Sequence, residues 1–191
     1  MAVCLFIKTN KLNNQSMNQF MNATKYLSII ALFILTSCAQ NNETARAQSE
    51  SDLDKAPNFE VTTIDGDTIS LSQSLADGKP VVVYFTASWC PTCARNWPAM
   101  SEVYPEFEDR LTLVAISIDP TDTEEVIRNL SEEKDFRFPS TSGHPEIMMD
   151  FGVSGQATTV GVDRDGNIAF KRPGEALSSD EFRELFTSLV E

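Results

Sequence analysis

Two cysteines separated by two residues carry the most reactive chemistry in this sequence. Cys90 and Cys93 lie in the run Trp89-Cys90-Pro91-Thr92-Cys93, and this spacing lets two thiols close into a small disulfide with little movement of the backbone. The thiolate is the reactive form of cysteine, and the partial positive charge of a helix N-terminus lowers the pKa of a thiol beside it. A Cys-x-x-Cys pair at the start of a helix is therefore a candidate redox switch.

The residues on either side of the pair predict a strand before it and a helix after it. Residues 81–85 form an unbroken apolar run rich in valine, which is typical of a buried central strand. After Cys93, apolar residues recur at spacings of three and four, which predicts a helix that runs to about residue 109 and is kinked or interrupted at Pro98. The two cysteines would thus lie where the strand ends and the helix begins.

Two other interpretations of the cysteine pair are possible. Cys-x-x-Cys is half of a zinc site, but a structural zinc needs two more ligands, and the other Cys and His residues are only Cys4, Cys38 and His144. The pair could also be buried and inert, but inert cysteines would not need Trp89 and Pro91 beside them. The redox interpretation is favoured over both.

The rest of the folded part alternates predicted strands and helices. In chain order we expect a hairpin over residues 59–70, a helical turn over 72–77, a strand over 111–118, a helix over 123–133, a short strand from 138, a short helix over 145–151, a hairpin over 158–171 and a final helix capped by Ser178 or Ser179. Val126, Ile127 and Leu130 should form the buried face of the helix over 123–133. The pattern predicts one α/β domain over residues 56–191, with a mixed central sheet flanked by helices.

Three segments together resemble a known family. Residues 81–93, the preceding run Ala56-Pro57-Asn58-Phe59 and the later run Gly152-Val153-Ser154-Gly155 are similar to the thioredoxin superfamily, and more narrowly to its membrane-anchored, extracytoplasmic thiol–disulfide oxidoreductases of the TlpA/ResA type. The resemblance covers residues 56–190. It implies a thioredoxin-like fold with an N-terminal β-hairpin and a central strand–helix insertion.

The resemblance also implies a mechanism and partners. Cys90 would attack the disulfide of a partner protein and Cys93 would resolve the mixed disulfide, with no cofactor and no metal at the site. Trp89 would shield the pair and offer an apolar docking face, with Pro91 and Thr92 completing the surround. Partner proteins would carry disulfides or dithiols, and an unidentified membrane donor would supply electrons.

The sequence departs from that family at two positions near the cysteines. The family has a cis-proline in a Gly-x-Pro-Thr-Thr loop facing the disulfide, whereas this chain has Ala157 followed by Thr158. Because a cis bond before a non-proline costs about 3–4 kcal/mol, we expect a trans bond before Ala157. Asn96 stands where the family has a buried glutamate that tunes the thiols. Asparagine cannot take up a proton, so the thiols would be less tuned, the substrate would not be a protein disulfide, or Asn96 would be simply a polar first-turn residue.

A metal-handling or peroxide-related binding module with low turnover is the alternative function. His144 suggests the copper chaperones of the same superfamily, but those use a CxxxC spacing. Peroxiredoxins share a Cys-Pro-Thr triplet, but they need Thr or Ser three residues before the cysteine and Pro seven before it. Ala87 and Val83 occupy these positions here.

The first 55 residues are predicted to precede the fold. Residues 1–37 resemble a signal peptide with an over-long start, for which Met17 or Met21 would be a more ordinary beginning. Its apolar core is too short to span a bilayer, which takes about 20 residues. Leu35-Thr36-Ser37-Cys38 resembles the bacterial lipobox, so Cys38 would be lipidated. Residues 38–55 would then be a disordered tether to a membrane, on its extracytoplasmic side.

The charge of the chain excludes one class of partner. With 28 acidic and 15 basic residues, the chain carries a formal net charge of −13. A strongly negative protein is repelled by the phosphates of nucleic acid. We therefore expect no nucleic-acid partner.

Overall fold

The computed structural model describes residues 55–191. The predicted signal peptide, Cys38 and the tether up to residue 54 lie outside the described residues. Lys55 forms an isolated antiparallel bridge with Asn167, and the Ala56 amide donates to the Gly166 carbonyl oxygen at 2.9 Å. The domain therefore includes Lys55, which the sequence analysis had assigned to the tether.

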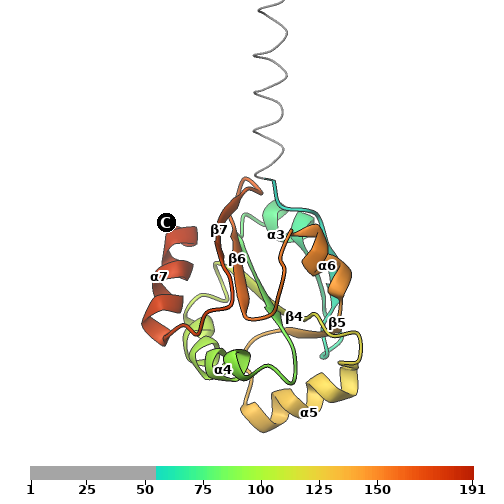
Figure 1. The fold of residues 1–191 in the computed structure, drawn as a ribbon. Coiled ribbons are helices and arrows are strands. Elements are labelled where there is room, and N and C mark those ends of the chain that lie inside the picture. Colours follow the sequence, from blue (N-terminus) through green and yellow to red (C-terminus); the bar gives the residue numbers. More distant parts are fainter. Residues whose placement is uncertain (1–54) are drawn as a thin grey trace, which may run out of the picture. The chain divides into compact units, whose positions relative to one another are not determined.

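A five-stranded mixed sheet forms the centre of the domain (Figure 1). The strand order is β5-β4-β3-β6-β7, with β3 (Val81–Thr86) in the middle. β4 (Thr112–Ser117) and β5 (Ser140–Gly143) run parallel to β3, whereas β6 (Thr158–Val162) and β7 (Ile168–Arg172) complete the sheet in antiparallel pairs. All six residues of β3 are buried, which confirms the predicted central strand.

Successive side chains of the central strands point to opposite faces of the sheet and pack into two hydrophobic cores. Val82 and Tyr84 of β3 face a core that α4 (Pro91–Val103) and α7 (Ser179–Val190) cover. Val81, Val83 and Phe85 face the other core, beneath the hairpin, α3 (Leu71–Ala76) and α6 (Pro145–Asp150). Figure 1 shows α4 and α7 on one side of the sheet and α3 and α6 on the other. The predicted α/β architecture is confirmed.

The remaining elements also follow the sequence pattern. β1 (Glu60–Thr62) and β2 (Thr68–Ser70) form the N-terminal antiparallel hairpin, and α5 (Glu124–Lys134) follows β4. The Thr123 side chain caps α5, and a capping box of Ser178 and Glu181 begins α7.

Two local expectations were wrong. The helix after the cysteines ends at Val103 instead of residue 109, and a 3-10 turn, η1 (Tyr104–Glu106), follows it. Tyr104 keeps helical backbone angles and its amide still bonds to the Met100 carbonyl oxygen, but Pro105 has no N–H with which to continue the α-helical hydrogen bonds. Pro98 lies inside α4 without ending it. Val126 is exposed, so Ile127 is the fully buried residue of α5, with Leu130 packed partly against the core.

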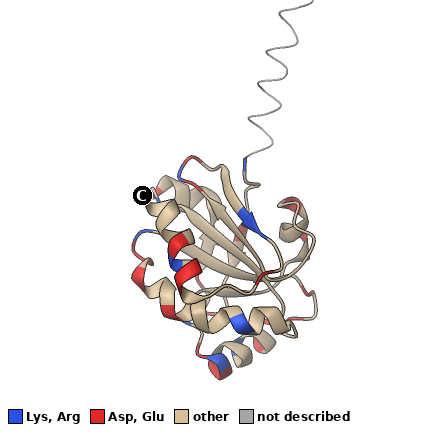
Figure 2. Ribbon diagram, turned by 60° about the vertical axis from the view of Figure 1, so that its left-hand side comes forward, with Lys and Arg blue, Asp and Glu red and all other residues tan. Residues whose placement is uncertain are grey.

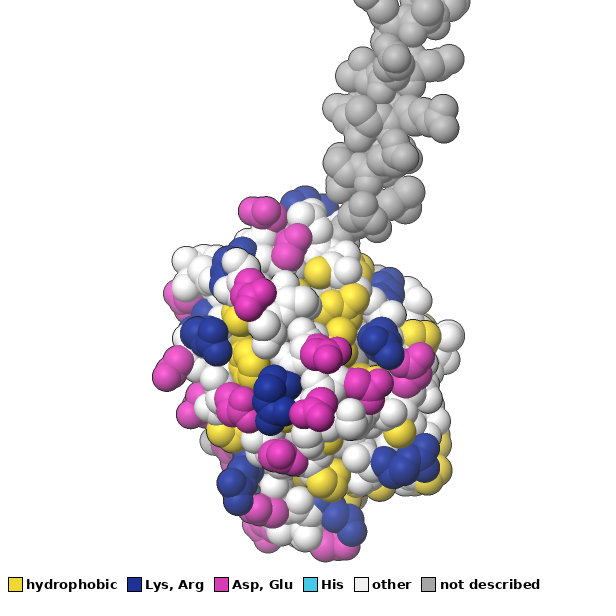
Figure 3. Space-filling view, turned by 90° about the vertical axis from the view of Figure 1, so that its left-hand side faces the viewer, with side chains coloured by type: hydrophobic (Ala, Val, Ile, Leu, Met, Phe, Trp, Pro, Cys, Tyr) yellow, Lys and Arg dark blue, Asp and Glu magenta, His cyan; other side chains and the backbone are white. Residues whose placement is uncertain are grey.

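Acidic and basic side chains are spread over the surface of the domain. Figure 2 shows Asp and Glu on the helices and loops with Lys and Arg among them, and the face drawn in Figure 3 shows the same mixture around smaller apolar areas. Within residues 55–191, no helix combines the length and the apolar character needed to cross a membrane.

Candidate active site

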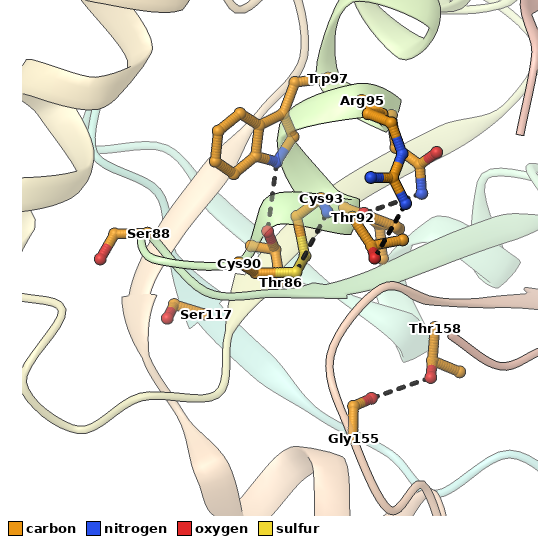
Figure 4. The surroundings of a disulfide bond; sticks show 12 residues. Thr86, Ser88, Cys90, Thr92, Cys93, Arg95, Trp97, Ser117, Gly155 and Thr158 are labelled. Carbon is orange, nitrogen blue, oxygen red and sulfur yellow. Dashed lines mark hydrogen bonds between the residues drawn. A yellow bond between two sulfur atoms is a disulfide. The ribbon is translucent and has the colours of Figure 1, made fainter. Parts of the chain in front are cut away.

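Cys90 and Cys93 form a disulfide where β3 leads into α4 (Figure 4). Their Cα atoms are 5.2 Å apart. Cys90 is the N-cap residue of α4, and its Sγ accepts a hydrogen bond of 3.1 Å from the Cys93 amide. In this oxidised form both side chains are buried, with Cys90 2% and Cys93 0% exposed. The sequence prediction of a thiol pair at a strand–helix junction is confirmed.

The residues between and beside the cysteines begin the helix. Pro91 occupies its first turn, where a missing N–H leaves no hydrogen bond unmade. The exposed Arg95 donates to the Thr92 hydroxyl at 3.2 Å. Pro91 and Thr92 thus give a short, rigid segment between the two sulfur atoms.

Trp89 is a large hydrophobic residue that is exposed beside the disulfide. Its side chain is 58% exposed, although it directly precedes the buried Cys90. The indole Nε1 donates a 2.5 Å hydrogen bond to Asp119 Oδ2. This bond and those from the Thr121 hydroxyl and amide hold the pKa of the Asp119 carboxyl below its usual range, with the Thr121 hydroxyl making the largest contribution. An ionised carboxylate therefore fixes one edge of an exposed aromatic ring.

Ala157 lies in the loop that precedes β6 and packs in the same core as both cysteines. All peptide bonds among residues 55–191 are trans, so the bond before Ala157 is trans as expected. Ala157 has φ +57°, a left-handed conformation that costs an alanine about 1 kcal/mol or more. Thr158 pairs with Phe85 of β3, and its hydroxyl donates to the Gly155 carbonyl oxygen at 2.8 Å. The loop is thus held against the end of β3 without a proline.

Asn96 is fully buried, and its side chain links α4 to the segment before α7 by hydrogen bonds. Its Nδ2 donates to the Tyr84 hydroxyl at 3.0 Å and to the Glu175 carbonyl oxygen at 2.8 Å, and its Oδ1 accepts from the Leu177 amide at 2.8 Å. A carboxylate cannot donate to a carbonyl oxygen, so this set of partners fits an amide and not an ionised glutamate. Through its amide, Asn96 therefore links α4 to the segment before α7.

The phenol beneath Asn96 stays neutral. Burial raises the pKa of Tyr84 well above its ordinary value, and the hydrogen bond from Asn96 lowers it only in part. Tyr84 and Asn96 thus form a polar but uncharged pair in the core that also contains both cysteines.

Asp122 is a site residue that the sequence analysis missed. Its carboxylate is 3% exposed and accepts three hydrogen bonds, from the Ser88 amide at 2.9 Å, the Ser88 hydroxyl at 2.6 Å and the Ser117 hydroxyl at 2.6 Å. From the sequence, residues 119–122 would only close the strand over 111–118, with Asp122 or Thr123 as the cap of the following helix. One signal was present: parallel strands end at the same edge of a sheet, so residues that follow β4 lie near those that follow β3.

His144 does not join the cysteines. It precedes α6, and its Nδ1 lies 3.0 Å from Glu146 Oε1. Among the residues that the structure describes, no group of three or more His, Cys, Asp and Glu side chains is arranged to hold a metal ion.

Comparisons with known proteins match this architecture. Residues 53–171 match the model of the AhpC/TSA family. Thiol-disulfide oxidoreductase ResA of Bacillus thuringiensis is 32% identical over 123 residues, which cover 63% of this chain and 69% of that protein. ResA of Oceanobacillus iheyensis is 31% identical over 174 residues, which cover 85% and 86% of the two chains.

Solved structures share the fold as well. A thioredoxin family thiol:disulfide interchange protein from Chlorobium tepidum superposes with a TM-score of 0.63 at 26% identity, covering 72% of this chain and 97% of that one.

Proposed function

The chain belongs to the AhpC/TSA family and to the ResA-like thiol–disulfide oxidoreductases, and we propose that it exchanges electrons with disulfides of partner proteins outside the cytoplasm. The observation that carries this proposal is the Cys90–Cys93 disulfide at the N-terminus of α4, beside the exposed Trp89. The names of the relatives support the activity, and the position of Cys90 at the start of α4 supports the proposed roles of the two thiols.

The reaction proceeds in two exchanges that conserve electrons. In the reduced protein, the Cys90 thiolate attacks one sulfur of the partner disulfide, forming a mixed disulfide and releasing the other partner sulfur as a thiolate. The Cys93 thiolate then attacks Cys90 Sγ and displaces the second partner thiolate. The partner gains two electrons and binds two protons from solvent as its thiols form, and Cys90 and Cys93 become the disulfide seen here.

The position of Cys90 at the helix N-terminus favours it as the attacking thiol. Its sulfur is the N-cap acceptor of α4 and lies within reach of the Cys93 amide. A thiolate here gains from the amide and from the partial positive charge of the helix end. Cys93, one turn into the helix and fully buried, is placed for the second, intramolecular step.

The pattern of the N-terminal residues supports the proposed extracytoplasmic location. A signal peptide over residues 1–37, lipid on Cys38 and a polar tether would hold the domain near a membrane surface, on the extracytoplasmic side. As a random coil, the sixteen mostly polar residues 39–54 would span about 20–25 Å on average. A membrane protein that donates electrons would then return the disulfide to its dithiol within that distance.

A trapping experiment tests the roles of the two cysteines. Cys93→Ser should accumulate a mixed disulfide between Cys90 and the partner, because the resolving thiol is gone, and Cys90→Ser should trap nothing. Non-reducing electrophoresis and mass spectrometry of the trapped peptide identify the linked residue. Trapping through Cys93 in the Cys90→Ser protein would reverse the assignment.

A further inference from the structure

The turn between β4 and α5 holds the two residues that precede Cys90. Asp122 accepts hydrogen bonds from the Ser88 amide and hydroxyl, and Asp119 accepts one from the Trp89 indole. Ser88 and Ser117, which share the Asp122 carboxylate, lie together on one side of the disulfide (Figure 4). Two carboxylates of one turn thus hold two consecutive residues next to the attacking sulfur.

Asp122 is itself held firmly by the strands beneath it. The Ser117 hydroxyl, at the end of β4, donates to the same carboxylate oxygen as the Ser88 amide. The Gly143 amide, at the end of β5, donates to the Asp122 carbonyl oxygen at 2.9 Å. A Cβ at Gly143 would overlap the carbonyl of Asp119, so the turn lies directly on the end of β5. The rigid sheet therefore fixes the position of this carboxylate.

The burial of Asp122 is not explained by an ion pair. No salt bridge within residues 55–191 includes it, and its three recorded side-chain partners are neutral donors. Taking a carboxylate out of water without a cation is costly and has to be offset by several hydrogen bonds. Two of its three bonds go to Ser88, two residues before Cys90.

We propose that Asp122 is a positioning residue for thiol–disulfide exchange and that Asp119 orients Trp89 for docking of the partner protein. Attack on a disulfide requires the incoming sulfur to approach along the S–S axis. A small misplacement of the reacting atoms lowers the reaction rate strongly. Ser88 sets the start of the Cys90 segment, together with the turn in which the Cys90 amide donates to the Ala87 carbonyl oxygen at 3.1 Å. The proposal rests on the function proposed above and adds the two residues that position Cys90 and Trp89 for it.

Two variants of Asp122 separate geometry from charge. Asp122→Ala removes all three acceptor interactions. Asp122→Asn can keep the geometry: its amide oxygen can accept from the Ser88 amide and the Ser117 hydroxyl, and its NH2 can donate to the Ser88 hydroxyl. With insulin as the disulfide substrate and dithiothreitol as the reductant, we expect kcat/KM to fall about tenfold or more in Asp122→Ala, mostly through kcat, and to stay within about threefold in Asp122→Asn.

Asp163→Ala is the matched control. Asp163 organises the β6–β7 turn in a comparable way, accepting from the Asn167 amide at 2.8 Å and the Asp165 amide at 3.0 Å, beyond the end of β6 that lies far from the cysteines. The Asp163→Ala protein should have a lower free energy of unfolding than wild type but the same kcat/KM. Unchanged kcat/KM in Asp122→Ala, an equal loss in Asp122→Asn, or an equal loss in Asp163→Ala would each overturn the positioning role. An inactive wild-type protein would instead overturn the proposed function.

A double-mutant cycle on Trp89 and Asp119 tests whether Asp119 orients Trp89 for docking. Trp89→Phe removes the indole N–H and Asp119→Ala removes its acceptor. Each should raise KM for insulin by several-fold, and Asp119→Ala should add nothing further in the Trp89→Phe background, because the two residues act through one hydrogen bond. Additive effects would overturn the role of Asp119. If Asp122→Ala does not fold, Ser88→Ala, which removes only the hydroxyl bond to Asp122, takes its place. It should lower kcat, and an unchanged kcat in Ser88→Ala overturns the role of Asp122.

Discussion

At the scale of single residues, Ala157 is the residue near the disulfide whose backbone is strained. An alanine at φ +57° is strained, and glycine relieves that strain. We expect Ala157→Gly to raise the free energy of unfolding by about 0.5–1 kcal/mol, even though it removes a buried methyl group. Urea unfolding measures it. Ala99→Gly, in the interior of α4, is the control and should lose about 1 kcal/mol. A less stable Ala157→Gly protein would show that methyl packing outweighs strain.

Asn96 offers a second test at this scale, through pH. In Asn96→Asp the carboxyl would be fully buried and would face the Tyr84 and Glu175 oxygens, so burial should raise its pKa in the folded state. A raised folded pKa means that the stability of the variant relative to wild type is greatest below the unfolded pKa of about 3.9 and falls as pH rises through the folded pKa. Urea unfolding at pH 4 and pH 8 measures the difference.

Asn58→Asp is the control for this pH dependence. Asn58 is exposed, and its Oδ1 accepts from the Ser72 amide, which a carboxylate can also do. Its stability relative to wild type should not fall between pH 4 and pH 8. If Asn96→Asp behaves in the same way, the 175–177 segment does not depend on the amide donor.

At the scale of elements, the sequence predicted what is local and missed what depends on the order of the strands. Neighbouring residues were enough to predict the apolar run of β3 and the position of the cysteines, and they narrowed the caps of α5 and α7 to two candidates each, of which Thr123 and Ser178 are the caps. The bonds of Asn96 join residues 79 and 81 positions apart, and the bond from Ser88 to Asp122 spans 34. Such partners follow only from which strands and helices are adjacent in the fold.

The contact between β5 and the turn after β4 gives a prediction at this scale. A side chain at Gly143 would collide with the Asp119 carbonyl and with Pro120. We expect Gly143→Ala to lower the free energy of unfolding by about 2 kcal/mol or more, because backbone must move to admit the methyl group. Thermal or urea unfolding measures this. Gly155→Ala, where an added Cβ meets nothing within 4 Å, is the control and should be nearly neutral. Equal stability of the two variants would contradict a tight contact.

At the scale of the whole molecule, charge and organisation favour a protein partner over nucleic acid. The chain carries a net charge of −13, and acidic and basic side chains are mixed over the surface of the domain (Figure 2). A single exposed tryptophan beside the disulfide is the feature suited to an apolar contact with a partner protein. A net negative charge favours solubility and does not by itself select a partner, so we expect the exposed Trp89 beside the disulfide to contribute to partner choice.

The proposed membrane anchor gives the last prediction, because it decides where the cysteine couple meets its partners. Expressed in a bacterium that processes lipoproteins, the mature chain should begin at Cys38 and carry lipid on that cysteine, and Cys38→Ala should release the domain from the membrane fraction. Mass spectrometry of the native N-terminus and detergent partitioning measure the two effects. Cys4→Ala is the control, since Cys4 would be removed with the signal peptide and its loss should change neither result. An unmodified chain beginning near Ala2 would contradict the anchor while leaving the exchange chemistry of Cys90 and Cys93 intact, because the domain that positions them begins only at Lys55.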